Sequence, residues 1–239
     1  MNSRLFAGFT TAAAMTSALV LAGTAQAATI SFSDSLALST TDIIDEVLSV
    51  QQFDSSLGTL TQVTLAFTGL VQGDARIESL DSQATTVTFN VGGSLTLLDG
   101  SDTLPNPLFD VEVTSADSAD VSAFDGVIDF AGTSGASFMG LEASTDGEQV
   151  YTDAALLSFF TGNGDLSFLF SAIANSQVTG AGNIASQIST LASAGITVTY
   201  EYDEIITESV PEPSTLLGLG AVLAAGAMTL RKRGNVLSK

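Results

Sequence analysis

The stretch Thr61-Gln62-Val63-Thr64-Leu65-Ala66-Phe67-Thr68 decides the fold class of this chain. Its large apolar residues, Val63, Leu65 and Phe67, alternate with small or polar neighbours. A period of two places alternate side chains on opposite faces of a β-strand. Threonine and valine, which are common here, are also enriched in strands. We therefore predict a strand with one buried face.

The same alternation recurs along the chain, and short clusters of glycine and acidic or amide residues separate the alternating segments. The further predicted strands cover residues 86–91 with Leu95 and Leu97, 166–172 and 196–203. The predicted turns are Gly73-Asp74, Asp99-Gly100, Asp125-Gly126, Asp146-Gly147 and Gly162-Asn163-Gly164. Many strands with turn-rich links favour an all-β fold, here a single antiparallel β-sandwich of jelly-roll or immunoglobulin-like type.

Two short helices are predicted to interrupt the strands. Residues 153–160 are expected to form a helix that begins at an N-cap, Thr152 or Asp153, and ends before Gly162. Ile184, Ile188 and Leu191 have helical spacing, and a strand is the alternative for that segment.

The N-terminal residues have the layout of an export signal. Arg4 precedes a mostly apolar segment, and Ala25-Gln26-Ala27 has the small-x-small pattern of a cleavage site. We predict a helical signal peptide over residues 1–27, cut by signal peptidase after Ala27. The alternative is an uncleaved first transmembrane helix.

The C-terminal residues have the layout of a membrane span. Residues 214–230 contain no charge and correspond to about 25 Å of helix, close to the thickness of a hydrocarbon core. Arg231, Lys232 and Arg233 follow at once and are predicted to stop transfer on the cytoplasmic side. We predict a transmembrane helix over 214–230 and a cytoplasmic tail over 234–239; the alternative is a buried core helix.

Between these ends, residues 28–209 are predicted to form one ectodomain that is strongly acidic. Of the 26 acidic residues only Glu212 lies outside it, and Arg76 is its single basic residue, so its formal net charge is −24. Such a surface repels nucleic acid and anionic lipid and attracts cations. The chain has no cysteine, so the apolar core alone must stabilise the domain.

The composition excludes most kinds of catalytic site. The chain has no histidine or cysteine, which excludes imidazole bases, thiol nucleophiles and zinc sites built from these ligands. The ectodomain also has no lysine. We therefore expect that the protein is not an enzyme and that it has no catalytic residue and no organic cofactor. A carboxylate-based glycoside hydrolase is a minor alternative, because some acidic pair will have suitable spacing by chance.

Calcium is the cofactor candidate, because this cation prefers carboxylate and carbonyl oxygens. Several acidic pairs occupy stretches with a turn-like composition. The candidate ligands are Asp99, Asp102, Asp125, Asp129, Asp146 and Glu148. At each position, a solvated acidic loop is the alternative interpretation.

Residues 210–233 resemble the PEP-CTERM sorting signal: Pro211-Glu212-Pro213, then the apolar segment, then the basic residues. The resemblance implies recognition of the tripeptide by an exosortase, a membrane-embedded protease or transpeptidase of Gram-negative bacteria. It also implies export across the inner membrane to the cell surface, the outer envelope or the medium. The chain would then contact the membrane transiently through 214–230, or stay anchored there.

Three other stretches are similar to the choice-of-anchor E domain. They are residues 52–65, residues 151–164 and the closing Val198-Thr199-Tyr200-Glu201-Tyr202. The resemblance implies an exported surface protein and supplies no active site.

Together these patterns predict an exported, exosortase-sorted protein of the surface or extracellular matrix. Its expected role is structural or adhesive and linked to exopolysaccharide or biofilm, with extracellular polysaccharide as a partner and no role for nucleic acid. The alternative is a carbohydrate- or calcium-binding module.

Overall fold

The computed structural model describes residues 27–205, so the predicted signal peptide, apart from Ala27, and the predicted transmembrane helix lie outside the described residues. The described part is almost entirely β-structure, with one short helix. In chain order the elements are β1 (Ala27–Thr40), β2 (Ile43–Gln51), β3 (Gly58–Ser79), β4 (Thr85–Asp99), β5 (Phe109–Val121), β6 (Gly135–Tyr151), α1 (Ala154–Phe160), β7 (Asp165–Ala174), β8 (Gln177–Thr179) and β9 (Ile184–Glu204).

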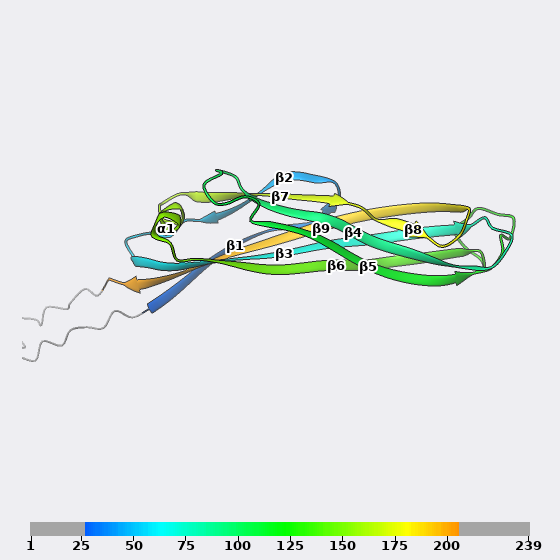
Figure 1. Cartoon of the computed structure of the whole chain (residues 1–239), viewed down its shortest axis with the longest axis horizontal. Coiled ribbons are helices and arrows are strands. Elements are labelled where there is room, and N and C mark those ends of the chain that lie inside the picture. Colours follow the sequence, from blue (N-terminus) through cyan, green and yellow to red (C-terminus); the bar gives the residue numbers. More distant parts are fainter. Residues whose placement is uncertain (1–26, 206–239) are drawn as a thin grey trace, which may run out of the picture. The chain divides into compact units, whose positions relative to one another are not determined.

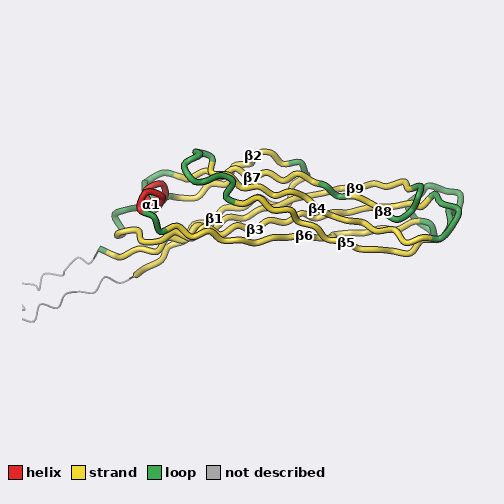
Figure 2. Tube along the Cα trace, in the orientation of Figure 1, coloured by secondary structure: helices red, strands yellow, loops and turns green. Residues whose placement is uncertain are grey.

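The strands form two antiparallel sheets packed face to face, as Figures 1 and 2 show. One sheet has the order β1-β9-β3-β6, and the other has the order β2-β7-β4-β5 with β8 paired to β4. This confirms the predicted antiparallel sandwich. The order differs from that of an immunoglobulin domain, in which the first two strands share a sheet, because here β1 and β2 lie in different sheets.

The stretch from Thr61 to Thr68 lies in β3, between β9 and β6. Val63, Leu65 and Phe67 are buried in the core, as the alternation predicted. The other alternating segments lie in β4, β7 and β9, and their apolar residues are buried too. Alternation therefore identified the core-facing side of both sheets.

The paired strands β3 and β9 run the whole length of the sandwich. They are 22 and 21 residues long, and their register extends from Gly58 opposite Glu204 to Ser79 opposite Ile184. A strand of this length spans about 70 Å. We call the end that contains Ala27 and Asp203, which are paired across β1 and β9, the terminal end. We call residues 80–84, 122–134 and 180–183, at the opposite end, the distal loops (Figure 1).

The helix predicted around Ile184, Ile188 and Leu191 is wrong, and the strand alternative is correct. This segment is the first part of β9 and pairs with the second half of β3. The ladder satisfies the backbone of both segments along their length, and this tertiary gain overrides the spacing of three apolar residues. The other predicted helix is confirmed as α1. Its N-cap is Asp153, whose carboxylate accepts hydrogen bonds from the backbone N–H groups of Ala155 and Leu156.

Two of the five predicted turns are wrong, because Gly73-Asp74 lies inside β3 and Asp146-Gly147 lies inside β6. A Cβ atom on Gly73 would lie 2.6 Å from Val91 Cγ2, and one on Gly147 would lie 2.9 Å from Phe109 Cε1. These glycines make room for side chains of the facing sheet. They therefore serve the packing of the core rather than a change of chain direction.

An aromatic cluster fills the core near the terminal end. The ring centroids of Phe53 and Tyr200 are 5.8 Å apart, and those of Tyr151 and Phe160 are 5.2 Å apart. These rings come from β9, from β6, from α1 and from the segment between β2 and β3, so their packing holds these four parts of the chain together. The cluster fixes α1 against the end of the sandwich.

Candidate functional site

The first pair of predicted calcium ligands lies in the turn after β4. Asp99 is buried, and its carboxylate accepts hydrogen bonds from the backbone N–H groups of Ser101, Thr103 and Leu104. Asp102 Oδ1 accepts a hydrogen bond from Asn106 Nδ2 at 2.8 Å. The two side chains therefore share one turn, and N–H donors already occupy both carboxylate oxygens of Asp99.

The second pair lies in one distal loop. Asp125 Oδ1 accepts a hydrogen bond from Val127 N at 3.0 Å, and Asp129 Oδ1 accepts one from Ala131 N at 2.9 Å. Each carboxylate thus stabilises its own local turn. Both side chains remain exposed to solvent.

The third pair, Asp146 and Glu148, lies in β6 rather than in a turn. Both are exposed and stand two residues apart, so they project from the same outer face of the sheet. Across residues 27–205, no group of three or more acidic, histidine or cysteine side chains is arranged to hold a metal ion.

A buried carboxyl group that the sequence pattern did not indicate lies near the distal loops. Glu78 is fully buried, and its Oε1 accepts a hydrogen bond from Ser134 Oγ at 2.5 Å. Its other oxygen, Oε2, is buried without a hydrogen-bond partner. An outward position in a strand normally predicts exposure, but the loop before β6 covers Glu78. No local sequence signal marks that cover.

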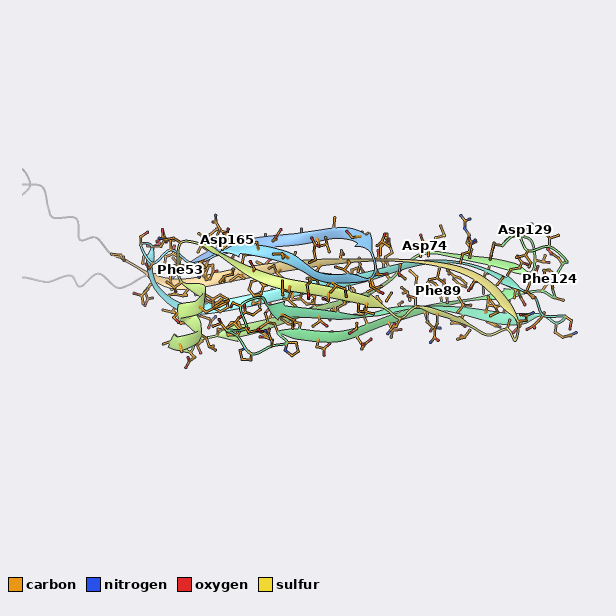
Figure 3. All side chains as sticks on the ribbon, turned by 90° about the horizontal axis from the view of Figure 1, so that it is seen from above. Phe53, Asp74, Phe89, Phe124, Asp129 and Asp165 are labelled. Carbon is orange, nitrogen blue, oxygen red and sulfur yellow. The ribbon has the colours of Figure 1, made fainter. Side chains whose placement is uncertain are left out.

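The distal loops are tied to one another through Asp81. Its carbonyl oxygen accepts a hydrogen bond from Phe124 N at 2.8 Å, and its carboxylate accepts one from Gly182 N at 2.6 Å. Beside this junction, Val127 and Ile128 are each 56% exposed. Figure 3 shows Phe124 and Asp129 at the end opposite Phe53 and Asp165. The distal end therefore presents apolar and acidic side chains on connected loops.

The outer face of the β1-β9-β3-β6 sheet is polar and carries a shallow groove of about 660 Å³. Ser35, Thr68 and Asp146 line it together with apolar side chains that include Leu38 and Leu70. The lining contains no aromatic side chain. The groove therefore lacks the ring platform on which many proteins stack sugars.

Residues 52–65 and 151–164, two of the stretches singled out in the sequence, contact each other at the terminal end. Gln52 Nε2 donates a hydrogen bond to the carbonyl of Phe159 at 2.9 Å, and Phe53 N donates one to the carbonyl of Phe160 at 2.8 Å. In the following turn, the backbone N–H of Ser56 lowers the pKa of Asp54. The stretches therefore act as joints between strands and α1.

Of the predicted processing residues, the structure describes one. Ala27 is the first residue of β1 and lies opposite Asp203. The other four processing residues lie outside the described residues, and so do the three predicted membrane-stop residues: Ala25, Pro211, Glu212 and Pro213, and Arg231, Lys232 and Arg233. No helix within residues 27–205 has the length and apolar character needed to cross a membrane.

Comparison with protein families identifies the C-terminal segment. Residues 209–233 match the PEP-CTERM protein-sorting motif. The motif implies an exported protein that is processed by an exosortase and sorted to the cell surface. No family match supports the resemblance to a choice-of-anchor E domain, and no curated protein matches the sequence.

Comparison with solved structures returns viral particles at low similarity. The Gx strain of infectious bursal disease virus has 12% identity and a TM-score of 0.18, covering 77% of this chain and 37% of that chain. Desmodium yellow mottle tymovirus has 10% identity and a TM-score of 0.19, covering 79% and 94% of the two chains. The T13 particle of infectious bursal disease virus has 10% identity and a TM-score of 0.23, covering 78% and 41%. At these scores the likeness carries no argument about function.

Proposed function

We propose that this protein is a non-enzymatic structural or adhesive component of the bacterial surface or extracellular matrix, linked to exopolysaccharide and biofilm. The observation that carries the proposal is the geometry of β3 and β9. Their ladder extends from the terminal end to the distal loops, with a single register shift between Leu60 and Gln62. The domain therefore suits a spacer that presents one end at a distance from the other.

The terminal end is the end from which the sorting motif follows in the sequence. β9 ends at Glu204, and the matched motif begins at residue 209. A protein sorted to the surface through that motif would hold the distal loops about 70 Å from Glu204, given the length of the strands. The exposed Val127 and Ile128 are then available for adhesive contacts.

The strand order supports a jelly roll as the finer fold assignment. The nine described strands divide into a four-stranded and a five-stranded antiparallel sheet, in which β8 is a short addition to β4, and most connections cross from one sheet to the other. We also retain a relationship to choice-of-anchor E domains as a proposal, supported by the contact between residues 52–53 and 159–160.

The chemistry of the carboxylates supports a non-enzymatic role. Asp99, Asp125 and Asp129 accept backbone hydrogen bonds in turns, so their charges already have structural uses. The chain has no histidine or cysteine that would supply another catalytic base or nucleophile. A glycosidase would need two carboxylates facing a shared cleft.

A deletion strain tests the proposed role. Loss of the gene should reduce cell attachment, aggregation or retention of surface polymer, and expression of the full chain should restore it. A rescue chain with Val127→Ser and Ile128→Ser should restore export but not attachment. A deletion strain with unchanged polymer, aggregation and attachment would refute the proposal. Intact-mass measurement of the protein from its host tests whether the chain ends near Pro211-Glu212-Pro213 after sorting.

A further inference from the structure

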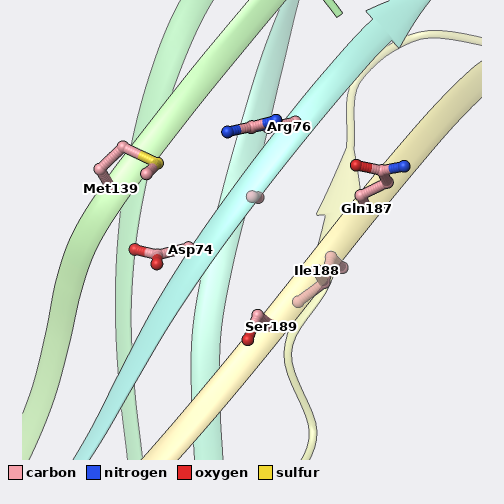
Figure 4. Close-up of a pocket in the computed structure, with 7 residues that line it drawn as sticks. Asp74, Arg76, Met139, Gln187, Ile188 and Ser189 are labelled. Atoms are coloured by element: carbon pink, nitrogen blue, oxygen red, sulfur yellow. The ribbon is translucent and has the colours of Figure 1, made fainter.

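The single basic side chain of the ectodomain lies beside a pocket on the outer face of β3. Arg76 lines a pocket of about 230 Å³ together with Asp74, Met139, Gln187, Ile188 and Ser189. Figure 4 shows these side chains around the pocket, on neighbouring strands β6, β3 and β9. The pocket therefore combines one cation with hydroxyl, amide and apolar groups.

A β-bulge in β6 binds the carboxylate of Asp74, which lines the same pocket as Arg76. The register passes from Gly73 opposite Leu141 to Ala75 opposite Phe138, so Met139 and Gly140 together face Asp74. Gly140 has a φ of 65°, and its N–H donates a hydrogen bond to Asp74 Oδ1 at 2.6 Å. This contact commits the Asp74 carboxylate to the backbone of β6.

Arg76 is consequently left without a charged partner. Among residues 27–205 it forms no salt bridge, although the ectodomain contains 25 acidic residues and no other base. A guanidinium presents several N–H donors in a planar fork that fits a carboxylate. An exposed, unpaired fork beside a pocket is therefore a recognition group rather than a stabilising ion pair.

We propose that this pocket binds the carboxylate of a uronic acid sugar. The guanidinium of Arg76 donates hydrogen bonds to the carboxylate, and the Gln187 amide and Ser189 hydroxyl form hydrogen bonds with hydroxyl groups of the sugar ring. The exposed Met139 and Ile188 contact the apolar edge of the ring. This inference rests on the proposed function, because it names the class of sugar through which the protein would bind a matrix polysaccharide.

The net charge of the domain limits which anionic ligands can bind at this pocket. One guanidinium with no second cation suits a singly charged carboxylate better than a doubly charged phosphate. The acidic remainder of the surface repels a densely charged polymer, so an isolated or terminal uronate is favoured. At 0.15 M salt the screening length is about 8 Å, which weakens this repulsion more than the direct contact.

Titration of the full chain in detergent with methyl β-glucuronide tests the proposal. At 0.15 M salt we expect saturable binding, and at least tenfold weaker binding of methyl β-glucoside, which has the same ring without the carboxylate. Acetate should also bind at least tenfold more weakly than the glucuronide. Equal binding of the two sugars, or equal binding of acetate and the glucuronide, would overturn the assignment.

Variants of the pocket provide a matched series. Arg76→Gln should abolish binding, and Arg76→Lys should weaken it about tenfold because lysine lacks the fork. Asp74→Asn keeps an oxygen for Gly140 N and removes a nearby negative charge, so it should tighten binding. Thr64→Ala, on β3 far from the pocket, is the control and should bind normally. Normal binding by Arg76→Gln would refute the site, whatever the outcome of the deletion strain.

Discussion

The buried hydroxyl of Tyr200 in β9 donates a hydrogen bond to the backbone carbonyl of Gln51 in β2, with a distance of 2.8 Å. Because β9 and β2 belong to different sheets, this bond joins the two layers of the sandwich across the core. Tyr200 is fully buried, and that burial raises the pKa of its hydroxyl. The bond lies inside the aromatic cluster and holds β2 in position.

Replacing Tyr200 by phenylalanine should lower the free energy of unfolding by about 1–2 kcal/mol. The substitution keeps the ring but removes the donor to the Gln51 carbonyl at a partly buried position. Urea unfolding measures the change. Tyr202→Phe, which removes a hydroxyl from the same strand, is the control and should cost less than about 0.5 kcal/mol. Equal losses for the two variants would contradict a special role of the Tyr200 bond.

The domain should lose stability in alkali as pH rises from about 10 to about 12. Burial, and then the nearby charge of Asp99, raises the pKa of Tyr151 to about 12. The unfolded chain therefore releases this proton first, and rising pH favours unfolding until the folded tyrosine also ionises. Melting temperatures between pH 8 and pH 12 measure the effect. Tyr151→Phe should flatten the decline, and an unchanged slope would argue against Tyr151 as its source.

Replacing Glu78 by glutamine should stabilise the domain at neutral pH, by about 1 kcal/mol or more. Glu78 is buried with one unpartnered oxygen, so a carboxyl group at this position carries a desolvation cost, which a glutamine amide that keeps an oxygen for Ser134 should reduce. Ser134→Ala should instead destabilise by about 1–3 kcal/mol, because Glu78 then loses the hydrogen bond donated by Ser134 Oγ. Chemical unfolding measures both variants. Destabilisation of equal size in both would show that Glu78 is better satisfied than its contacts indicate.

Gly73→Ala should destabilise the domain by about 1–3 kcal/mol through overpacking. The new methyl group would lie 2.6 Å from Val91 Cγ2 and 2.8 Å from Phe89 Cζ, which belong to the facing sheet. Gly182→Ala is the matched control, because its methyl group would meet only the carboxylate of Asp81, at 3.5 Å or more. Thermal unfolding compares the two. A neutral Gly73→Ala would show that the core relaxes around the added methyl group.

Calcium and magnesium should raise the melting temperature of residues 28–209 by similar amounts. The acidic surface attracts either cation through general screening, and no described acidic cluster offers a preformed site. Melting curves with each salt at equal ionic strength, and then with EDTA, provide the measurement. A much larger rise with calcium would reveal a specific site, and the separate variants Asp99→Asn and Asp125→Asn would then show which of the two turns holds it.

Local pattern predicted much of the fold but little of the candidate sites. The alternation of Val63, Leu65 and Phe67 was enough to identify a strand and its buried face. The turn predicted at Gly73-Asp74 was wrong because a glycine beside an aspartate is common in turns. In the structure Gly73 instead leaves room for the ring of Phe89 in the facing sheet, a contact that the local sequence does not show. Glu78 was missed because the loop that buries it begins more than forty residues later.

The sequence by itself determined the β-class of the domain, the acidic charge, the missing catalytic side chains and the C-terminal sorting motif. Each follows from composition or from neighbours along the chain, and so needs no knowledge of distant contacts. Only the tertiary structure decided the strand order, the burial of Glu78 and the unpaired state of Arg76. These features depend on which strands pair and in which register. At the bulge in β6, Gly140 N donates a hydrogen bond to the Asp74 carboxylate, and Arg76 forms no salt bridge with any described residue.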